Sequence, residues 1–323
     1  MFHIHNGDCS AEIAKRSSIP GEHFAWREAV VEGPAPANRD AAEWRKLRAQ
    51  YLAEAYGLDH DVEKELAAQD EQLKRAGERD EVVLWFEHDL FCQVNLIYLL
   101  DWFSRELPGA KLSLVCINKF PGKQNFRGLG ELNPEELASL FPKRQTVVPR
   151  RFAAASAAWQ AYCSRDPTDI QSLVETDIDA LPFLPAALRV HLRRFPSTRN
   201  GLGRIENCAL EIIGSGTASF GEVFRKFQDV EPIYGTGDAQ FWIALRRLID
   251  VSQPLLSLTN ATITTDVDPS AQFEITELGK SVLAGEGDFV SINGINQWLG
   301  GVYLEDDRAL WRWDEETEKL VYG

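Results

Sequence analysis

Long apolar runs alternate with amphipathic segments in the first half of the chain. Residues 82–86 and 112–117 are continuous apolar runs, the pattern of strands that are buried on both faces of a parallel sheet. Residues 2–5 and 23–26 predict two further strands, and helical spacing between the runs predicts crossover helices. We therefore expect an α/β fold with an open, mostly parallel, Rossmann-like sheet and helices on both faces.

A long and highly charged segment, residues 40–78, interrupts this alternation. Apolar residues recur in it at helical spacing, and Gly57 divides it into two helices. The pattern predicts a helical hairpin that is inserted between two strands. With a short last strand at residues 147–148, the α/β domain is predicted to span residues 1–148.

Helical patterns dominate the rest of the chain. Residues 149–200 predict a helical connector. Residues 201–323 predict three helices, two extended segments and a short helix, which is the order of a winged helix-turn-helix. The third of these helices, residues 238–250, would be the recognition helix. A C-terminal β-hairpin that turns at residues 305–308 is predicted to close this winged-helix-like domain.

The net charge of −15 is unevenly distributed along the chain. Residues 1–139 hold 16 basic and 24 acidic side chains, residues 140–200 hold 9 and 5, and residues 201–323 hold 9 and 20. Non-specific binding to DNA requires cations that neutralise phosphates, so the acidic C-terminal region argues against a nucleic acid partner. The expected recognition helix contributes only Arg246 and Arg247 as cations.

Five cysteines are scattered along the chain without a CxxC pair, which predicts reduced thiols and neither a zinc knuckle nor a disulfide framework. The first residues lack the basic start and the apolar run of a signal peptide. No apolar run approaches the ~18 residues of a membrane span. These patterns predict a cytoplasmic protein that has no membrane partner.

Polar side chains follow the predicted strands, at the sheet edge where open parallel sheets bind ligands. The candidate catalytic residues there are His5, Asp8, Glu87, His88 and Asp89. Imidazole and carboxylate groups transfer protons and bind divalent cations, so His5, Asp8, His88 and Asp89 are also the candidate metal ligands. The alternative is that Asp8 and Asp89 merely cap the helices that follow them.

Phosphate binding has weaker support from local motifs. Gly7 lies where the first strand meets its helix, and backbone N–H groups there would suit a phosphate, although Asn-Gly-Asp is also typical of an ordinary turn. Neither GxGxxG nor GxxxxGK[ST] occurs in the chain. Cys92 starts a helix near the predicted crevice, and we favour a buried structural thiol there over a nucleophile.

The basic middle segment predicts a second anion-binding group. Arg189, His191, Arg193 and Arg199 lie on or just after one predicted helix, where they would suit a phosphate. Two alternatives remain open: a solvated helix face, or a set of cations that dock against the acidic regions of the same chain. At the C-terminus, Trp311 and Trp313 share a strand face with Trp298 nearby, and such aromatic rings either stack on a base or sugar or fill a core.

Several motifs follow one another in a specific order. They are residues 5–8 (HNGD), 32–34 (EGP), 84–90 (LWFEHDL) with Gln93, 195–201 (FPSTRNG) with Glu206, and 298–302 (WLGGV) with 311–313 (WRW). In this order the chain resembles, over most of its length, the bacterial family catalogued as domain of unknown function 1835. The resemblance implies a bacterial, cytosolic protein and coincides with the crevice residues, and it implies no particular activity.

Three functional hypotheses follow from these patterns. The first is an enzyme, a hydrolase or transferase, that acts on a phosphate-bearing or nucleotide-like small molecule, with a divalent metal as the candidate cofactor. The second is a ligand-sensing regulator that uses its C-terminal module to bind a protein partner. The third, a DNA-binding regulator, is the least favoured because that module is acidic.

Overall fold

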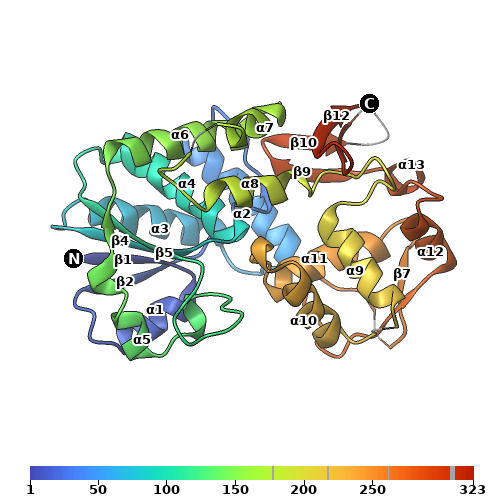
Figure 1. The fold of residues 1–323 in the computed structure, drawn as a ribbon, viewed down its shortest axis with the longest axis horizontal. Coiled ribbons are helices and arrows are strands. Elements are labelled where there is room, and N and C mark those ends of the chain that lie inside the picture. The colour runs from blue at the N-terminus through green and yellow to red at the C-terminus, as the bar shows by residue number, and fades with distance from the viewer. Residues whose placement is uncertain (177, 217, 261, 306–309) are drawn as a thin grey trace.

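The computed structural model describes residues 1–323 except 177, 217, 261 and 306–309. The described residues form a mixed α/β molecule with one five-stranded sheet, three smaller sheets and thirteen α-helices. Figure 1 shows the large sheet in the N-terminal half of an elongated molecule and a mainly helical C-terminal half beside it. The predicted α/β class and mostly parallel sheet are therefore confirmed.

The large sheet has the strand order β2-β1-β4-β5-β6. Its strands are β1 (Phe2–Asn6), β2 (Glu22–Trp26), β4 (Val82–Glu87), β5 (Leu112–Ile117) and β6 (Gln145–Thr146). The first four are mutually parallel, and only β6, two residues earlier than predicted, is antiparallel. The chain leaves β1 for β2 on one side and later returns to β4 on the other, so the winding direction reverses between β1 and β4. Ligands of open α/β sheets bind at such switch points.

Helices cover both faces of the sheet. The helices α1 (Asp8–Lys15) and α5 (Pro134–Ala138) lie on one face, while α4 (Leu90–Glu106) lies on the other beneath α6 (Pro149–Cys163) (Figure 1). Strand alternation divides β1 between these layers: Phe2 and Ile4 pack into the core around α4, and the side chains between them turn to the opposite face. Because α4 is enclosed by the sheet and α6, nearly all its residues are buried.

The inserted helical hairpin has the predicted form. The helices α2 (Ala41–Tyr56) and α3 (Val62–Ala76) begin after Asp40 and Asp61, whose carboxylates accept bonds from the first-turn N–H groups. Gly57 ends α2 with a φ of 65°, a left-handed conformation that suits glycine.

Three helices and a small antiparallel pair of strands form the centre of the C-terminal half. The remaining helices are α7 (Thr168–Val174), α8 (Leu184–Leu192), α9 (Arg204–Gly214), α10 (Phe220–Val230), α11 (Asp238–Ile249), α12 (Glu277–Ala284) and α13 (Phe289–Asn293). The strands β7 (Leu256–Leu258) and β8 (Phe273–Ile275) pair between α11 and α12. Phe227 stacks on Phe241 with ring centroids 4.7 Å apart, so aromatic side chains hold α10 against α11.

The C-terminus contains two hairpins, so the prediction of a single C-terminal hairpin is wrong. The strand β9 (Asn296–Gly300) pairs with β10 (Val302–Glu305), and β11 (Trp311–Asp314) pairs with β12 (Lys319–Tyr322). Gly300, at a φ of 63°, allows the tight turn that splits the predicted long strand. Of the predicted turn at 305–308, residues 306–308 lie outside the described residues. The short strand β3 (Gly33–Pro34) joins β9, which ties this region to the N-terminal half.

Three histidines, two of them buried and one half-buried, form a cluster on the α1 face of the sheet. His3 and His5 lie there by strand alternation, with His23 stacked on His3 at 4.5 Å and within 3.0 Å of His5 Nε2. Burial disfavours the charged imidazolium: it lowers the pKa of His3 to about 4, that of His5 well below its usual value, and that of His23 in the same direction.

Acid is expected to destabilise the protein through this cluster. The unfolded chain binds protons near pH 6.5 while folded His3 binds them only near pH 4, so stability is complete above pH 6.5 and falls as the pH drops towards 4. Each such histidine steepens the pH dependence of the unfolding free energy by about 1.4 kcal/mol per pH unit. Urea unfolding of wild-type protein and His3→Gln between pH 7 and 5 measures the difference in slope. An equal slope of unfolding free energy against pH in both proteins would contradict this explanation. Replacement of the exposed His60 by glutamine is the control and should leave that slope unchanged.

Among the described residues, no helix combines the length and the apolar character that a membrane span requires.

Candidate functional site

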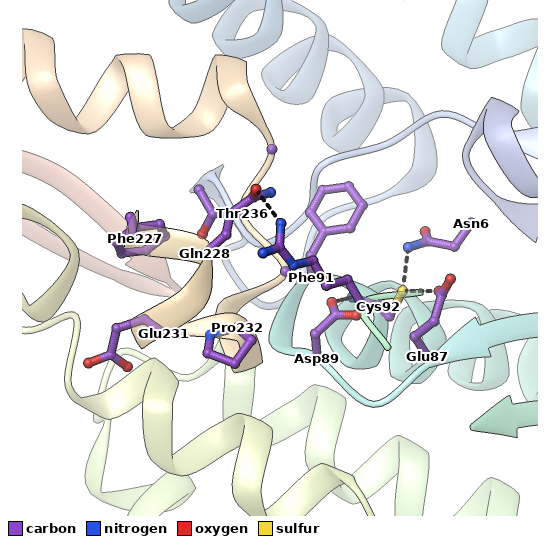
Figure 2. Close-up of a pocket in the computed structure, with 13 residues that line it drawn as sticks. Asn6, Glu87, Asp89, Phe91, Cys92, Phe227, Gln228, Glu231, Pro232 and Thr236 are labelled. Carbon is purple, nitrogen blue, oxygen red and sulfur yellow. Dashed lines mark hydrogen bonds between the residues drawn. The ribbon is translucent and has the colours of Figure 1, made fainter. Parts of the chain in front are cut away.

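A cavity of about 290 Å³ lies at the switch point, between the N-terminal sheet and the C-terminal helices (Figure 2). On the sheet side it is lined by the carboxyl ends of β1 and β4 and the start of α4. Opposite them lie the end of α10, the 3₁₀ turn η3 (Pro232–Tyr234) and the residues before α11. Its lining residues are Asn6, Glu87, Asp89, Phe91, Cys92, Arg127, Phe227, Gln228, Glu231, Pro232, Gly235, Thr236 and Gly237.

Glu87 is the last residue of β4, and its carboxylate is buried at the base of the cavity. Its Oε1 accepts a bond of 2.7 Å from the backbone N–H of Leu129, and its Oε2 accepts one of 2.7 Å from the Cys92 thiol. Gly128 lies so close that a Cβ atom there would be 3.0 Å from Oε1. The loop before η1 (Leu129–Glu131) therefore holds this carboxylate in place.

Asp89 caps α4, and its side chain also borders the cavity. Its Oδ1 accepts a bond of 2.9 Å from the Cys92 N–H, which is the capping role predicted as the alternative for this residue. Gly235 packs against the same carboxylate: a Cβ atom at Gly235 would lie 2.0 Å from Asp89 Oδ1. A glycine of the C-terminal half thus allows the close approach that encloses Asp89.

Asn6 and Cys92 join the two strand ends. The Asn6 amide donates to the Cys92 sulfur at 2.9 Å (Figure 2), and Asn95 donates to the Asn6 carbonyl oxygen at 2.8 Å. Burial, together with the carboxylates of Asp89 and Glu87, raises the pKa of the Cys92 thiol well above its usual value. Cys92 is therefore a neutral hydrogen-bond donor to Glu87 in this arrangement, and not a thiolate nucleophile.

The surroundings disfavour the charged form of both carboxylates. Burial, followed by the nearby charge of Asp89, raises the pKa of Glu87 to about 7. Burial also raises the pKa of Asp89, although its bond from the Cys92 N–H opposes the rise. A carboxyl group that titrates near neutral pH can donate and accept a proton under physiological conditions, which is what a general acid–base catalyst requires.

Glu87 and Asp89 differ from the other buried carboxylates of the described chain. Glu28, Glu32, Asp101, Glu206 and Glu231 each form an ion pair with an arginine. Within the same described residues, neither Glu87 nor Asp89 has an ion pair, although both are less than a tenth exposed. Burying a charge without a partner destabilises a fold, so unpaired carboxylates facing a cavity are typical of a functional site.

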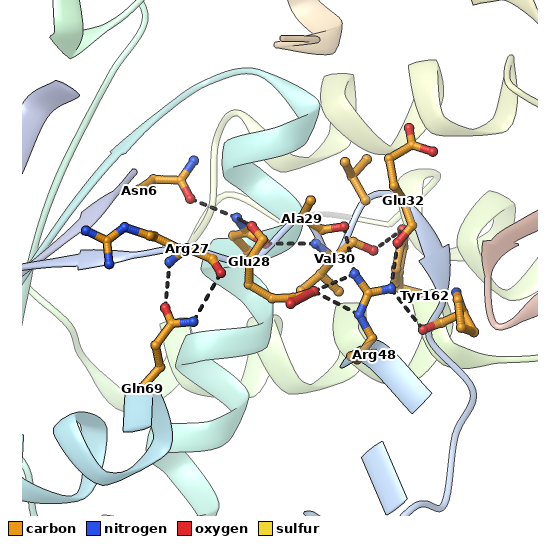
Figure 3. A network of polar contacts seen from close by, with 12 residues as sticks. Asn6, Arg27, Glu28, Ala29, Val30, Glu32, Arg48, Gln69 and Tyr162 are labelled. Atoms are coloured by element: carbon orange, nitrogen blue, oxygen red, sulfur yellow. Dashed lines mark hydrogen bonds and ion pairs between the residues drawn. The ribbon is translucent and has the colours of Figure 1, made fainter. Parts of the chain in front are cut away.

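A network of polar contacts fixes the segment after β2 beside this cavity (Figure 3). The fully buried Arg48 pairs with Glu28 and donates to the backbone oxygens of Ala29, Glu32 and Pro34. Arg194 of the C-terminal side pairs with Glu32 at 2.6 Å and donates to Val31 O at 2.6 Å. The segment therefore connects the helical hairpin to the turn between α8 and α9. These contacts hold the two halves together beside the cavity.

Only two of the five candidate catalytic residues, Glu87 and Asp89, line the cavity. His5 is fully buried on the α1 face, stacked on Trp85 at 5.4 Å, because β1 continues for one residue beyond it. Asp8 forms an exposed two-pronged ion pair with Arg27, which lowers the pKa of its carboxyl.

The other candidates at the strand ends also lie apart from the cavity lining. His88 is half-buried, and its ring meets the edge of Phe183 at 6.1 Å. The Gly7 N–H already donates to His5 O and Trp26 O, at 2.9 and 3.1 Å. That N–H group is therefore occupied within the fold.

The four candidate anion-binding side chains of the middle segment make separate contacts. Arg189 donates to Val174 O, Arg193 lies 3.8 Å from Glu231, and Arg199 donates to Leu283 O. His191 is fully buried against Tyr162, and burial lowers its pKa well below its usual value. The contacts of Arg193 and Arg199, like the pair of Arg194 with Glu32, correspond to the alternative of cations that dock against acidic regions of the same chain.

Other cavity residues carry no signal in the sequence that would single them out. Arg127 lies in the loop after β5, where it donates to Gln228 at 3.1 Å and pairs with Asp229. The segment 227–237 reaches the cavity only because α10 packs against α11, a tertiary contact that local patterns do not encode.

One group of side chains has the composition of a metal site. Glu87, Asp89 and Cys92 each offer one ligand atom within 4.8 Å of the others. Carboxylate and thiolate ligands together suit zinc. Of the predicted metal ligands, only Asp89 belongs to this group.

Comparisons with known proteins add no assignment. No protein-family model matches the chain. No curated protein matches it either. The resemblance to the family catalogued as domain of unknown function 1835 therefore stays a prediction.

Proposed function

We propose that the protein is an enzyme, a hydrolase or transferase, that acts on a small molecule bound in the switch-point cavity. Glu87 would transfer the proton, and the charge of Asp89 would help to keep the pKa of Glu87 near neutrality. The observation that carries this proposal is the contrast among buried carboxylates: five of them, including Glu231 of the same cavity, pair with an arginine, whereas Glu87 and Asp89 have no ion pair among the described residues. We also infer a Rossmann-like N-terminal sheet, since its winding reverses at the cavity.

The substrate we propose is phosphate-bearing or nucleotide-like. Arg127 is the one cation among the described lining residues, and it lies beside Gln228 on the side of the cavity that α10 forms. An anionic group would bind beside Arg127 while the reacting part of the substrate extends towards Glu87. A divalent cation held by Glu87, Asp89 and a deprotonated Cys92 is an alternative to proton transfer by Glu87, because the cation would replace the protons of these groups; it would reduce repulsion between a phosphate and the carboxylates.

Gly235→Ala tests the site without changing any lining side chain other than the glycine. The new methyl group would lie 2.0 Å from Asp89 Oδ1 and would displace that carboxylate, so turnover should fall at least tenfold. Gly216→Ala is the matched control, because Gly216 also has a positive φ but has open space where a Cβ atom would lie. Both variants should lose similar stability from backbone strain, on the order of 1 kcal/mol.

The activity itself is sought by incubating the protein with nucleotides, sugar phosphates and phosphate esters, with Mg²⁺, Mn²⁺ or Zn²⁺. Phosphorus NMR and mass spectrometry detect the products. Turnover that Gly216→Ala retains and Gly235→Ala loses supports the enzyme. Turnover that both variants retain would place the reaction elsewhere in the molecule.

A ligand-sensing regulator is the second candidate, because both halves of the molecule line the cavity. A ligand bound there would contact the sheet and the C-terminal helices together, so it would stabilise one arrangement of the two halves. Binding without turnover in the same screen favours this candidate.

A DNA-binding role has less support. The α9–α11 helices with β7 and β8 follow the winged-helix-like order that we infer for this module. However, the cations of α11 are engaged within the chain: Arg246 donates to Ala55 O, and Arg247 pairs with Glu206. We therefore expect no salt-dependent retention on duplex DNA, and retention at low salt would contradict this expectation.

A further inference from the structure

The two C-terminal hairpins each carry a cross-strand tryptophan–tyrosine pair. Trp298 lies opposite Tyr303 in the β9–β10 register, with ring centroids 4.8 Å apart. Trp311 lies opposite Tyr322 in the β11–β12 register, with ring centroids 5.0 Å apart. All four rings line one cavity of about 390 Å³. The two tyrosine rings are exposed, Tyr303 to 39% and Tyr322 to 65%, and the two tryptophan rings are half-buried.

Two glycines bring this aromatic cavity to the C-terminal end of α6. A Cβ atom at Gly300 would lie 2.4 Å from Tyr162 O, and one at Gly301 would lie 2.0 Å from Cys163 O. The Gly301 N–H donates to Tyr162 O at 2.9 Å. Larger residues would hold the hairpin away from the helix. The close approach places Arg165, two residues after α6, at the cavity edge.

Arg165 supplies the only charge among the described residues that line this cavity. It is exposed and has no hydrogen-bond or ion-pair partner among the residues that the structure describes. The other arginine of this region, Arg312, is engaged by Asp288 at 2.7 Å on the opposite side of β11. Arg165 also borders an adjoining hollow, where Asn38, Arg39 and Ser164 offer further polar groups.

We propose that this aromatic cavity is a second ligand site, which binds a mononucleotide. The base would stack on the tryptophan and tyrosine rings, since a planar heterocycle presents the π-face that aromatic side chains contact. The phosphate would bind Arg165 and extend into the hollow beside Arg39. Guanidinium groups bind phosphate through paired charge-assisted bonds.

The surroundings favour a single nucleotide over a nucleic acid strand. Residues 201–323 hold 20 acidic side chains against 9 basic ones, and a long polyanion would meet that negative field. The cavity volume is also within the range of small-molecule sites. The inference is independent of the catalytic role of Glu87, because the lining residues of the two cavities have no member in common.

Quenching of tryptophan fluorescence in the full chain tests the site, with AMP, adenosine and ribose 5-phosphate as probes. AMP should quench saturably, and Trp311→Leu should weaken the binding of AMP and adenosine alike. Arg165→Gln should weaken the binding of AMP at least tenfold and the binding of adenosine less than threefold. Because Arg165 is exposed, its variant should fold even if Trp311→Leu does not. Arg150→Gln, at the other end of α6, is the matched control and should bind AMP as the wild-type protein does.

Other outcomes would overturn the inference. The inference is overturned if AMP has no saturable effect on the fluorescence up to 10 mM, about the weakest binding worth assigning. Equal affinities of Arg165→Gln and Arg150→Gln for AMP would also overturn it. AMP binding that Glu87→Gln loses while Arg165→Gln keeps it would place the nucleotide in the switch-point cavity instead. In contrast, loss of turnover in Gly235→Ala with unchanged AMP quenching is the result that two distinct sites predict.

Discussion

Glu87→Gln is expected to be more stable than the wild-type protein at pH 9 and to lose turnover at least a hundredfold. The pKa of Glu87 is raised to about 7 in the fold, against 4.5 for the ordinary group, so the folded state binds the proton more tightly. The stability that this proton confers is complete below pH 4.5 and is lost as the pH rises through 7. The charged carboxylate then costs on the order of 3 kcal/mol, which glutamine avoids.

Repeating the stability comparison at pH 5 separates the effect of the Glu87 charge from other effects of the substitution. There the wild-type carboxyl is protonated and resembles the amide, so urea unfolding should give nearly equal stabilities for the two proteins. An enzyme that gains stability when it loses its acid–base residue shows the usual conflict between stability and activity.

Glu206→Gln is the matched control for this experiment. Glu206 is also a buried glutamate, but Arg247 binds it at 3.0 Å. Removing its charge should destabilise the protein by about 3 kcal/mol at either pH, because Arg247 loses a buried partner. If Glu87→Gln were destabilised in the same way, Glu87 would be a structural group and the proposed function would lose its main support.

Arg48→Met is expected to destabilise the protein by about 3–5 kcal/mol, the largest stability effect we predict. The substitution leaves the Glu28 carboxylate buried without its partner, and it removes the donors to the backbone oxygens of Ala29, Glu32 and Pro34. Since this segment lies between the two halves, binding in the switch-point cavity should weaken as well. Denaturant unfolding at pH 7 measures the change.

Arg45→Met, one turn earlier on α2, provides the comparison. Arg45 pairs with Asp70, and both side chains are about one-fifth exposed. Solvent reduces the stabilisation that such an ion pair gives, so the unfolding free energy is expected to fall by about 1 kcal/mol. Equal losses in the two variants would show that the network around Arg48 has no special role in holding the segment.

Much of the fold could be predicted because local patterns encode it. The apolar runs of β4 and β5 have few alternatives to a buried parallel strand, and Asp40 and Asp61 cap helices as expected. The two terminal hairpins do not follow from the alternation of polar and apolar residues alone, because residues 297–304 have the pattern of one strand. The adjacent Gly300 and Gly301 are the local signal for the turn that divides this stretch, and their close approach to α6 is a tertiary contact that local patterns do not encode.

The candidate site could be predicted only in part. Strand ends identified Glu87 and Asp89, since topology alone places the carboxyl ends of β1 and β4 together. His5 precedes the strand end by one residue, and a one-residue difference turns a side chain to the other face of a sheet. The wall formed by Phe227 and Gly235 depends on how α10 packs against the rest, which no local pattern specifies.

The most direct test of the central claim is the titration of the Glu87 carboxyl group itself. Carbon NMR of protein labelled at the glutamate side-chain carboxyl, compared with Glu87→Gln, assigns the signal and follows it from pH 4 to 9. We predict one signal that is absent from the variant and has a midpoint near pH 7, because burial beside Asp89 raises the pKa of Glu87. A midpoint near the ordinary value of 4.5 would mean that Glu87 is fully ionised at neutral pH, and it would contradict a role in proton transfer.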